Sequence, residues 1–115
     1  MLFNFSISEQ PGCIIISLEG ELIEKNQAID LLKKTDELIA AGKTKIGINL
    51  ANLKYMNSSG LNTMIQLLTK ARNDGGEVVI CNMNKKINEL LLITKLNTLF
   101  KVVETEQAAV SLLTK

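Results

Sequence analysis

The chain has 115 residues, of which 46% are hydrophobic and 22% charged, and its formal net charge is +1. This balance predicts one globular domain over residues 1–115 with its own core, and it excludes a disordered chain. Three Phe, one Tyr and no Trp, without a basic stripe, exclude the surfaces that bind nucleic acid by neutralising phosphates and stacking bases.

The N-terminal third of the chain predicts two strands and a helix. Phe3, Phe5 and Ile7 alternate with polar residues, and an Ile-rich run at 13–18 follows a turn at 10–12. These two runs predict an antiparallel hairpin. A helix is then expected, with Asn26 as its N-cap and Gly42 just after its end.

The rest of the chain continues the alternation. Strands are predicted at 45–50, 77–81 and 100–103, with a loop at 51–57. A second helix follows that loop, and Asn84 and Thr105 are the expected N-caps of a third and a fourth. The order ββαβαβαβα predicts an α/β fold: one mixed sheet of about five strands, with about four helices packed on it.

The residue types for catalysis are missing. The sequence has no His, so the usual general base and every His-containing catalytic triad are excluded. No glycine-rich phosphate loop is present. Cys13 and Cys81 end apolar runs and are interpreted as buried thiols. We therefore expect a protein that is not an enzyme, with no cofactor and no metal.

The cellular location is also an expectation from composition. Unpaired cysteines are typical of a reducing compartment, and neither a signal peptide nor an apolar run of the roughly 20 residues that cross a bilayer is visible. We therefore predict a cytoplasmic protein without direct membrane contact. The oligomeric state is left open, although Leu92, Ile93 and Leu96 could form an exposed apolar patch.

One segment stands out, at the transition from the third strand to the second helix. Asn57, Ser58, Ser59 and Gly60 lie where free backbone N–H groups and the positive end of the helix dipole favour an anion such as phosphate. The same residues are also ordinary helix-capping residues. From the residues alone, both interpretations stay open.

Four stretches together resemble the STAS domain family, most closely its stand-alone anti-sigma factor antagonists. They are Gly-Glu-Leu at 20–22, Asn-Ser-Ser-Gly-Leu at 57–61, Asp-Gly-Gly-Glu-Val-Val-Ile-Cys at 74–81 and Leu-Phe-Lys-Val-Val-Glu-Thr at 99–105. This resemblance implies a protein that binds an anti-sigma factor with serine kinase activity. It further implies that the kinase switches it off by phosphorylating Ser58, and that a metal-dependent serine phosphatase resets it.

The resemblance also implies which residues bind the partner. They are Gly20, Glu21, Asn57, Ser58, Ser59, Gly60, Leu61 and Asn62. Three positions depart from the family pattern, because Asn57 and Ile23 stand where the family has Asp, and Asn62 stands where it often has Gly. Two alternatives remain: Ser59 as a second modified residue, and a STAS module without phosphorylation, such as an accessory subunit of a transporter or a scaffold.

Overall fold

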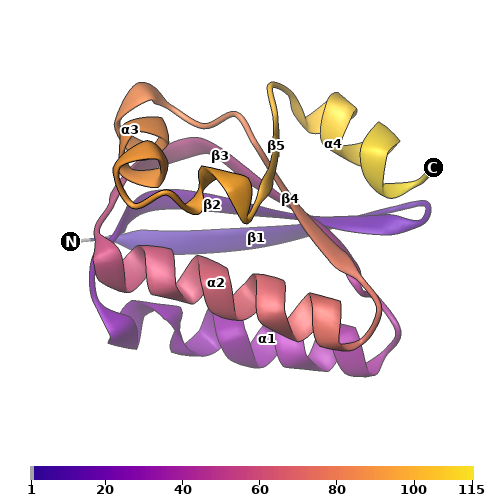
Figure 1. Cartoon of the computed structure of the whole chain (residues 1–115). Helices are drawn as coiled ribbons and strands as arrows, with labels where there is room; N and C mark the ends of the chain where they lie inside the picture. Colours follow the sequence, from indigo (N-terminus) through magenta and orange to yellow (C-terminus); the bar gives the residue numbers. More distant parts are fainter. Residues whose placement is uncertain (1) are drawn as a thin grey trace.

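The strands form one mixed sheet. The computed structural model describes residues 2–115. The strand order across the sheet is β1-β2-β3-β4-β5, with the bounds β1 Phe3–Gln10, β2 Cys13–Leu22, β3 Lys45–Met56, β4 Glu77–Cys81 and β5 Lys101–Val103. β1 is antiparallel to β2, and the other neighbours are parallel (Figure 1). The predicted mixed sheet with an N-terminal hairpin is therefore confirmed.

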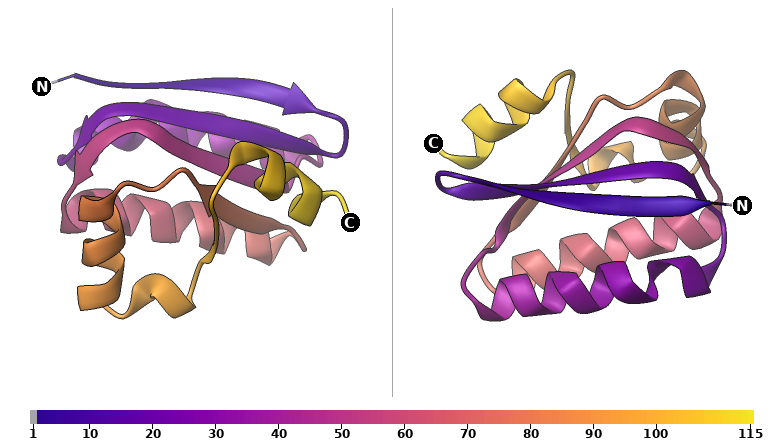
Figure 2. Two further views of the ribbon diagram at one scale, coloured as in Figure 1. Left: turned by 90° about the horizontal axis from the view of Figure 1, so that it is seen from above. Right: turned by 180° about the vertical axis from the view of Figure 1, so that it is seen from behind.

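The α-helices lie on both faces of the sheet. Their bounds are α1 Ile29–Ala40, α2 Ser58–Asn73, α3 Lys85–Ile93 and α4 Glu106–Leu113. α1 and α2 run side by side along one face, whereas α4 covers part of the other (Figure 2). Within residues 2–115, none of the helices combines the length and apolar character needed to span a bilayer.

Side chains that alternate along the strands point to opposite faces of the sheet and form two separate hydrophobic clusters. Ile14, Ile16 and Leu18 of β2 belong to the large core, which also includes buried residues of α1, α2 and α3. Cys13 and Cys81 belong to a smaller cluster that α4 completes. Both cysteines are unpaired and buried, as the sequence predicts.

The prediction that Asn26 caps the first helix is wrong. Asn26 lies inside a 3₁₀ helix, Lys25–Ala28, whose N-cap is Glu24, and α1 follows it directly. The physical reason is the side chain of Gln27, whose Oε1 accepts hydrogen bonds at 2.9 Å from the N–H groups of Ile23 and Glu24. The bond to Glu24 is part of a capping box that places the N-cap at Glu24, two residues before Asn26.

The prediction of a loop at 51–57 is also wrong for most of its length. β3 continues to Met56, and β2 continues beyond the predicted 13–18 to Leu22. The two strands pair as far as Leu22 and Met56, with register shifts after Ser17 and after Gly20. Irregular pairing of this kind breaks the two-residue alternation that identifies a strand from sequence. The extension brings the end of β2 beside the start of α2.

The remaining predicted helix ends agree with the structure. Asn84 accepts a hydrogen bond from the N–H of Ile87 at 2.9 Å, and Thr105 accepts one from the N–H of Ala108 at 3.1 Å. Gly42 follows α1 with φ +86°, the left-handed conformation that commonly ends a helix.

Candidate functional site

Ser58 is the first residue of α2, and its side chain is exposed, as is that of Ser59. Asn57 precedes them in an extended conformation, and its Oδ1 accepts a hydrogen bond from the N–H of Gly60 at 3.2 Å. The N–H groups of Ser58 and Ser59 belong to the first turn, which has no earlier helical carbonyl to bond. A solvent-exposed hydroxyl and the positive end of a helix dipole therefore lie at the same place.

The start of α2 is fastened to the end of β2. Asn57 Nδ2 donates a hydrogen bond to the carbonyl oxygen of Ile23 at 2.9 Å. The backbone N–H of Asn57 donates a second one to the carbonyl oxygen of Leu22 at 3.4 Å. Gly60 permits the close approach, because a Cβ at this position would lie 2.3 Å from the Leu22 carbonyl oxygen. Helix start and strand end therefore form one surface.

Gln27 is a residue of this surface that the sequence analysis did not single out. Besides accepting from Ile23 and Glu24, its amide Nε2 donates to the carbonyl oxygen of Glu21 at 3.1 Å. The available signal was the spacing of Glu24 and Gln27, three residues apart before an apolar helical pattern, which is typical of reciprocal helix capping.

Gly20 and Glu21 reach the site from β2. They pair with Leu53 and Tyr55 on β3, just before Asn57. Gly20 has φ +91°, and a Cβ there would lie 2.0 Å from the carbonyl oxygen of Leu2. The backbone at this register shift therefore requires glycine, and two residues further along the carbonyl oxygen of Leu22 accepts a hydrogen bond from Asn57.

The eight predicted partner-binding residues differ in exposure. Ser58, Ser59 and Asn62 are exposed, Gly20, Glu21 and Asn57 are half-buried, and Gly60 and Leu61 are buried. Leu61 is only 4% exposed and is part of the large core. The exposed members can contact another protein through their side chains, whereas Gly60 and Leu61 support the surface from beneath.

The thiols are unsuited to nucleophilic chemistry. Burial, reinforced by the negative charge of Glu106, raises the pKa of the Cys13 thiol. The same two causes raise the pKa of Cys81 to about 11. Both groups are therefore protonated near neutral pH, whereas the thiolate is the reactive form. Within residues 2–115, no cluster of three or more His, Cys, Asp and Glu side chains could hold a metal ion.

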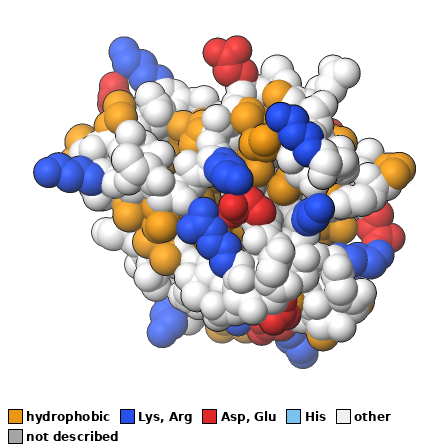
Figure 3. All heavy atoms as spheres, turned by 45° about the vertical axis from the view of Figure 1, so that its right-hand side comes forward, with side chains coloured by type: hydrophobic (Ala, Val, Ile, Leu, Met, Phe, Trp, Pro, Cys, Tyr) orange, Lys and Arg blue, Asp and Glu red, His pale blue; other side chains and the backbone are white. Residues whose placement is uncertain are grey.

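Charged side chains of both signs share another face of the molecule. Figure 3 shows Lys and Arg side chains beside acidic ones there. Glu77, at the start of β4, pairs with two cations: its carboxylate oxygens lie 3.0 Å from Arg72 Nε and 3.4 Å from Lys101 Nζ. Arg72 also donates to the carbonyl oxygen of Leu99, so this group ties the end of α2 to β4 and β5.

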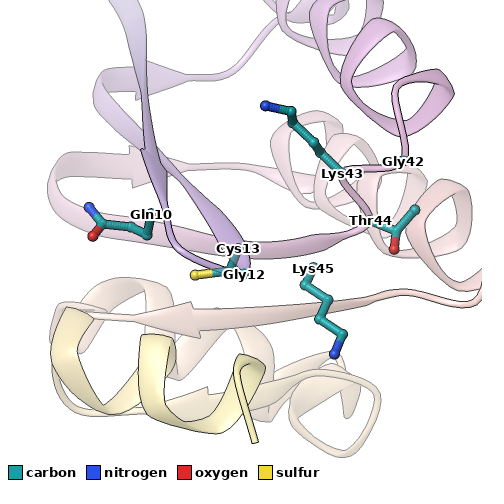
Figure 4. Close-up of a pocket in the computed structure, with 7 residues that line it drawn as sticks. All are labelled: Gln10, Gly12, Cys13, Gly42, Lys43, Thr44 and Lys45. Carbon is teal, nitrogen blue, oxygen red and sulfur yellow. The ribbon is translucent and has the colours of Figure 1, made fainter.

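A pocket of about 350 Å³ lies beside the start of β3 (Figure 4), whereas Ser58 follows the end of that strand. It is lined by the turn between β1 and β2 and by the connection from α1 to β3, including Gln10, Cys13 and Lys45. Lys43 in its wall forms an ion pair with Glu9. None of the predicted site residues lines this pocket.

Known proteins resemble this chain over its whole length. The anti-sigma F factor antagonist of Paenibacillus polymyxa is 28% identical over 117 aligned positions, which cover 100% of this chain and 96% of that protein. A crystal structure of a protein from Thermotoga maritima matches with a TM-score of 0.87 at 23% identity, covering 96% of this chain and 95% of the other.

A third relative has been solved in two chemical states. The anti-sigma factor antagonist SpoIIAA in its unphosphorylated form matches with a TM-score of 0.74 at 20% identity, covering 94% of this chain and 96% of the other. The phosphorylated form of SpoIIAA from Bacillus matches with a TM-score of 0.73 at 21% identity, covering 94% and 97%. A profile of the STAS domain matches residues 4–109. The chain therefore belongs to the STAS domain family.

Proposed function

We propose that this protein is an anti-sigma factor antagonist, which binds an anti-sigma factor with serine kinase activity and is released when that kinase phosphorylates Ser58. The observation that carries the proposal is the exposed Ser58 hydroxyl at the start of α2, beside the end of β2. The whole-length similarity to proteins named as anti-sigma factor antagonists supports the choice of partner.

Physical chemistry supports a switch that acts on binding more than on folding. A phosphoserine carries about −1.5 to −2 charges at neutral pH. The first turn of α2 accommodates this charge, because its free N–H groups and helix dipole stabilise anions. A partner surface closed over Ser58 has to dehydrate the phosphate or oppose it with like charge, and both cost free energy.

The proposal assigns the remaining roles to other proteins. ATP and Mg²⁺ belong to the kinase, and a metal-dependent serine phosphatase restores the unmodified form. The antagonist itself acts as a cytoplasmic binding protein without catalysing a reaction. The exposed Ser58, Ser59 and Asn62 contact the partner, and Asn57, Gly20 and Glu21 hold the surface in place.

Substitutions at Ser58 test the proposal with purified proteins. We expect Ser58→Ala to bind the cognate anti-sigma factor within about threefold of the wild-type affinity, and Ser58→Asp to bind at least about tenfold more weakly, a loss of about 1.4 kcal/mol. Ser111→Asp, which adds the same charge to an exposed position of α4 away from the Ser58 surface, is the matched control and should bind like wild type. Isothermal titration calorimetry measures all three affinities, and wild-type affinity of Ser58→Asp contradicts the proposal.

A second candidate function is a STAS module that binds its partner without phosphorylation. The observation that favours it is Asn57, which occupies the position of an Asp in the family pattern and uses its amide nitrogen to hold Ile23. This candidate predicts that the protein acquires no phosphate from any co-expressed anti-sigma factor kinase. It also predicts that a transport-complex subunit or a scaffold protein binds equally to wild type and Ser58→Asp.

A further inference from the structure

The outer edge of β1 has no strand beside it. β1 is the first strand in the sheet order, it is eight residues long, and it forms one margin of the molecule (Figure 2). Alternate residues of such an edge direct N–H and C=O groups away from the sheet. Proteins commonly protect an edge with Lys, Pro or a very short strand. β1 has neither residue, and Glu9 is its one charged side chain.

A groove of about 530 Å³ runs between this edge and α1. Phe5 and Ile7 line it from the strand, and both side chains are half-buried and pack against the large core. From α1 the groove is lined by two acidic and two basic side chains, Asp30, Lys33, Lys34 and Glu37. The lining therefore combines partly exposed apolar side chains with four charges that sum to zero. A second identical surface can satisfy both features.

We propose that β1 and α1 form the interface of a symmetric dimer of this chain. A two-fold axis perpendicular to the sheet places β1 antiparallel to β1 of the second copy, and the two sheets become one of ten strands. The same axis places the two α1 helices antiparallel on one face. When it passes beside Thr35, Lys33 lies opposite Glu37 of the second copy, and the symmetry makes this pair twice.

The balanced charge is the reason for choosing a second copy over an unrelated strand. A register centred between Lys33 and Lys34 would oppose like charges, so the charges on α1 also select one alignment of the two copies. The interface is separate from the proposed function. Ser58 follows the end of β3 at the start of α2, whereas β1 is the edge strand of the sheet, so a dimer through β1 leaves both copies of the Ser58 surface open.

Charge reversal across the interface tests the proposal with the untagged full-length chain. We expect wild type to show a concentration-dependent dimer by sedimentation velocity between about 1 μM and 1 mM. Lys33→Glu and Glu37→Lys should each raise the dimer dissociation constant at least about tenfold, because each change creates two repulsive pairs per dimer. The double variant should return within about threefold of wild type. Lys86→Glu and Glu89→Lys, both exposed on α3, are matched controls expected to change nothing.

Hydrogen exchange locates the contact in the unmodified protein. On raising the protein concentration, we expect new amide protection in residues 3–10. A wild-type chain that stays monomeric at about 1 mM overturns the proposal. A dimer whose amide protection lies elsewhere, such as at the exposed residues Leu92 and Ile93 on α3, also overturns it. A double variant that does not regain the wild-type dissociation constant overturns it as well. Protection of β1 that requires another protein shows an unrelated strand as the occupant and likewise overturns it.

Discussion

Asn57 joins two segments of the chain through opposite ends of one side-chain amide. Its oxygen caps α2 by accepting from Gly60, and its nitrogen donates to the carbonyl oxygen of Ile23 at the end of β2. An Asp at this position would cap the helix equally well but would have no donor for Ile23. The structure therefore gives a physical reason for an amide where the STAS pattern has a carboxylate.

This dual role predicts unequal effects of two substitutions. We expect Asn57→Ala to lower the free energy of unfolding by about 2 kcal/mol, because a helix cap and a second hydrogen bond are both lost. Asn57→Asp should cost about half as much, since it keeps the cap and gains a favourable interaction with the helix dipole. Urea denaturation measures both. Asn62→Ala, on the exposed side of the same helix, serves as the control, and an Asn57→Ala variant as stable as this control would contradict the assigned role.

At Gly60, replacement by Ala is predicted to destabilise the protein, although helix propensity alone would predict stabilisation. Replacing Gly by Ala inside an exposed helix stabilises it by about 1 kcal/mol. At Gly60 the added methyl group would lie 2.3 Å from the Leu22 carbonyl oxygen and 2.8 Å from Met56 Cβ. We therefore expect Gly60→Ala to destabilise the protein by about 1–3 kcal/mol through forced displacement of α2. A rise in the thermal unfolding midpoint would show that α2 does not press on β2 as described.

At the scale of elements, the regular parts of the fold follow from local patterns. The alternation of β1 and the caps Asn84 and Thr105 each depend on residues adjacent in sequence, so the prediction and the structure agree. The loop at 51–57 was mispredicted because Leu53 and Met56 are buried through irregular pairing with β2. That pairing depends on contacts more than thirty residues apart in the sequence, which no local periodicity records.

The candidate site shows the same division. Asn57 and Ser58 could be located from the change of strand to helix pattern, and the structure has them at that transition. The capping by Gln27 could have been located from its spacing with Glu24, but its hydrogen bond to Glu21 could not, because that bond depends on the path of the chain after β2. The first cap was misplaced at Asn26 because the neighbouring Gln27, in the same 3₁₀ helix, accepts from the backbone N–H of Glu24.

The ion-pair group at the end of α2 makes an element-scale prediction about pH. Burial raises the pKa of Glu77, but hydrogen bonds from Arg72, Val78 and Lys101, with the charge of Arg72, outweigh it and leave the pKa below its ordinary value. A carboxyl with a lowered folded-state pKa stabilises the protein above its unfolded-state pKa. The stabilisation is lost as the pH falls through the folded-state value.

We therefore expect Glu77→Gln to lower the free energy of unfolding by about 1–2 kcal/mol at pH 7. The difference from wild type should shrink as the pH is lowered from 5 toward 3, because wild type becomes protonated there. Urea denaturation at pH 7, 5 and 3 measures the trend. Glu89→Gln, an exposed carboxyl on α3, provides the control. A difference that is unchanged at pH 3 would contradict this role for Glu77.

At the scale of the whole molecule, the proposed interactions occupy different parts of the sheet. The Ser58 surface lies where β2 and β3 end, the pocket of Figure 4 lies beside the start of β3, and β1 is the edge strand. A phosphate on Ser58 is therefore expected to change the affinity for the partner without rearranging the core or the β1 edge. Circular dichroism of the modified and unmodified protein should accordingly be the same.

The most direct test of the account is the phosphate itself. The protein is expressed with its cognate anti-sigma factor kinase, its intact mass is measured, and the modified residue is mapped by fragmentation. We predict the addition of one phosphate, located on Ser58, and at least about tenfold weaker binding of the modified protein to the anti-sigma factor. Phosphate on Ser59 alone, or a phosphorylated Ser58 that binds with unchanged affinity, would contradict the central claim.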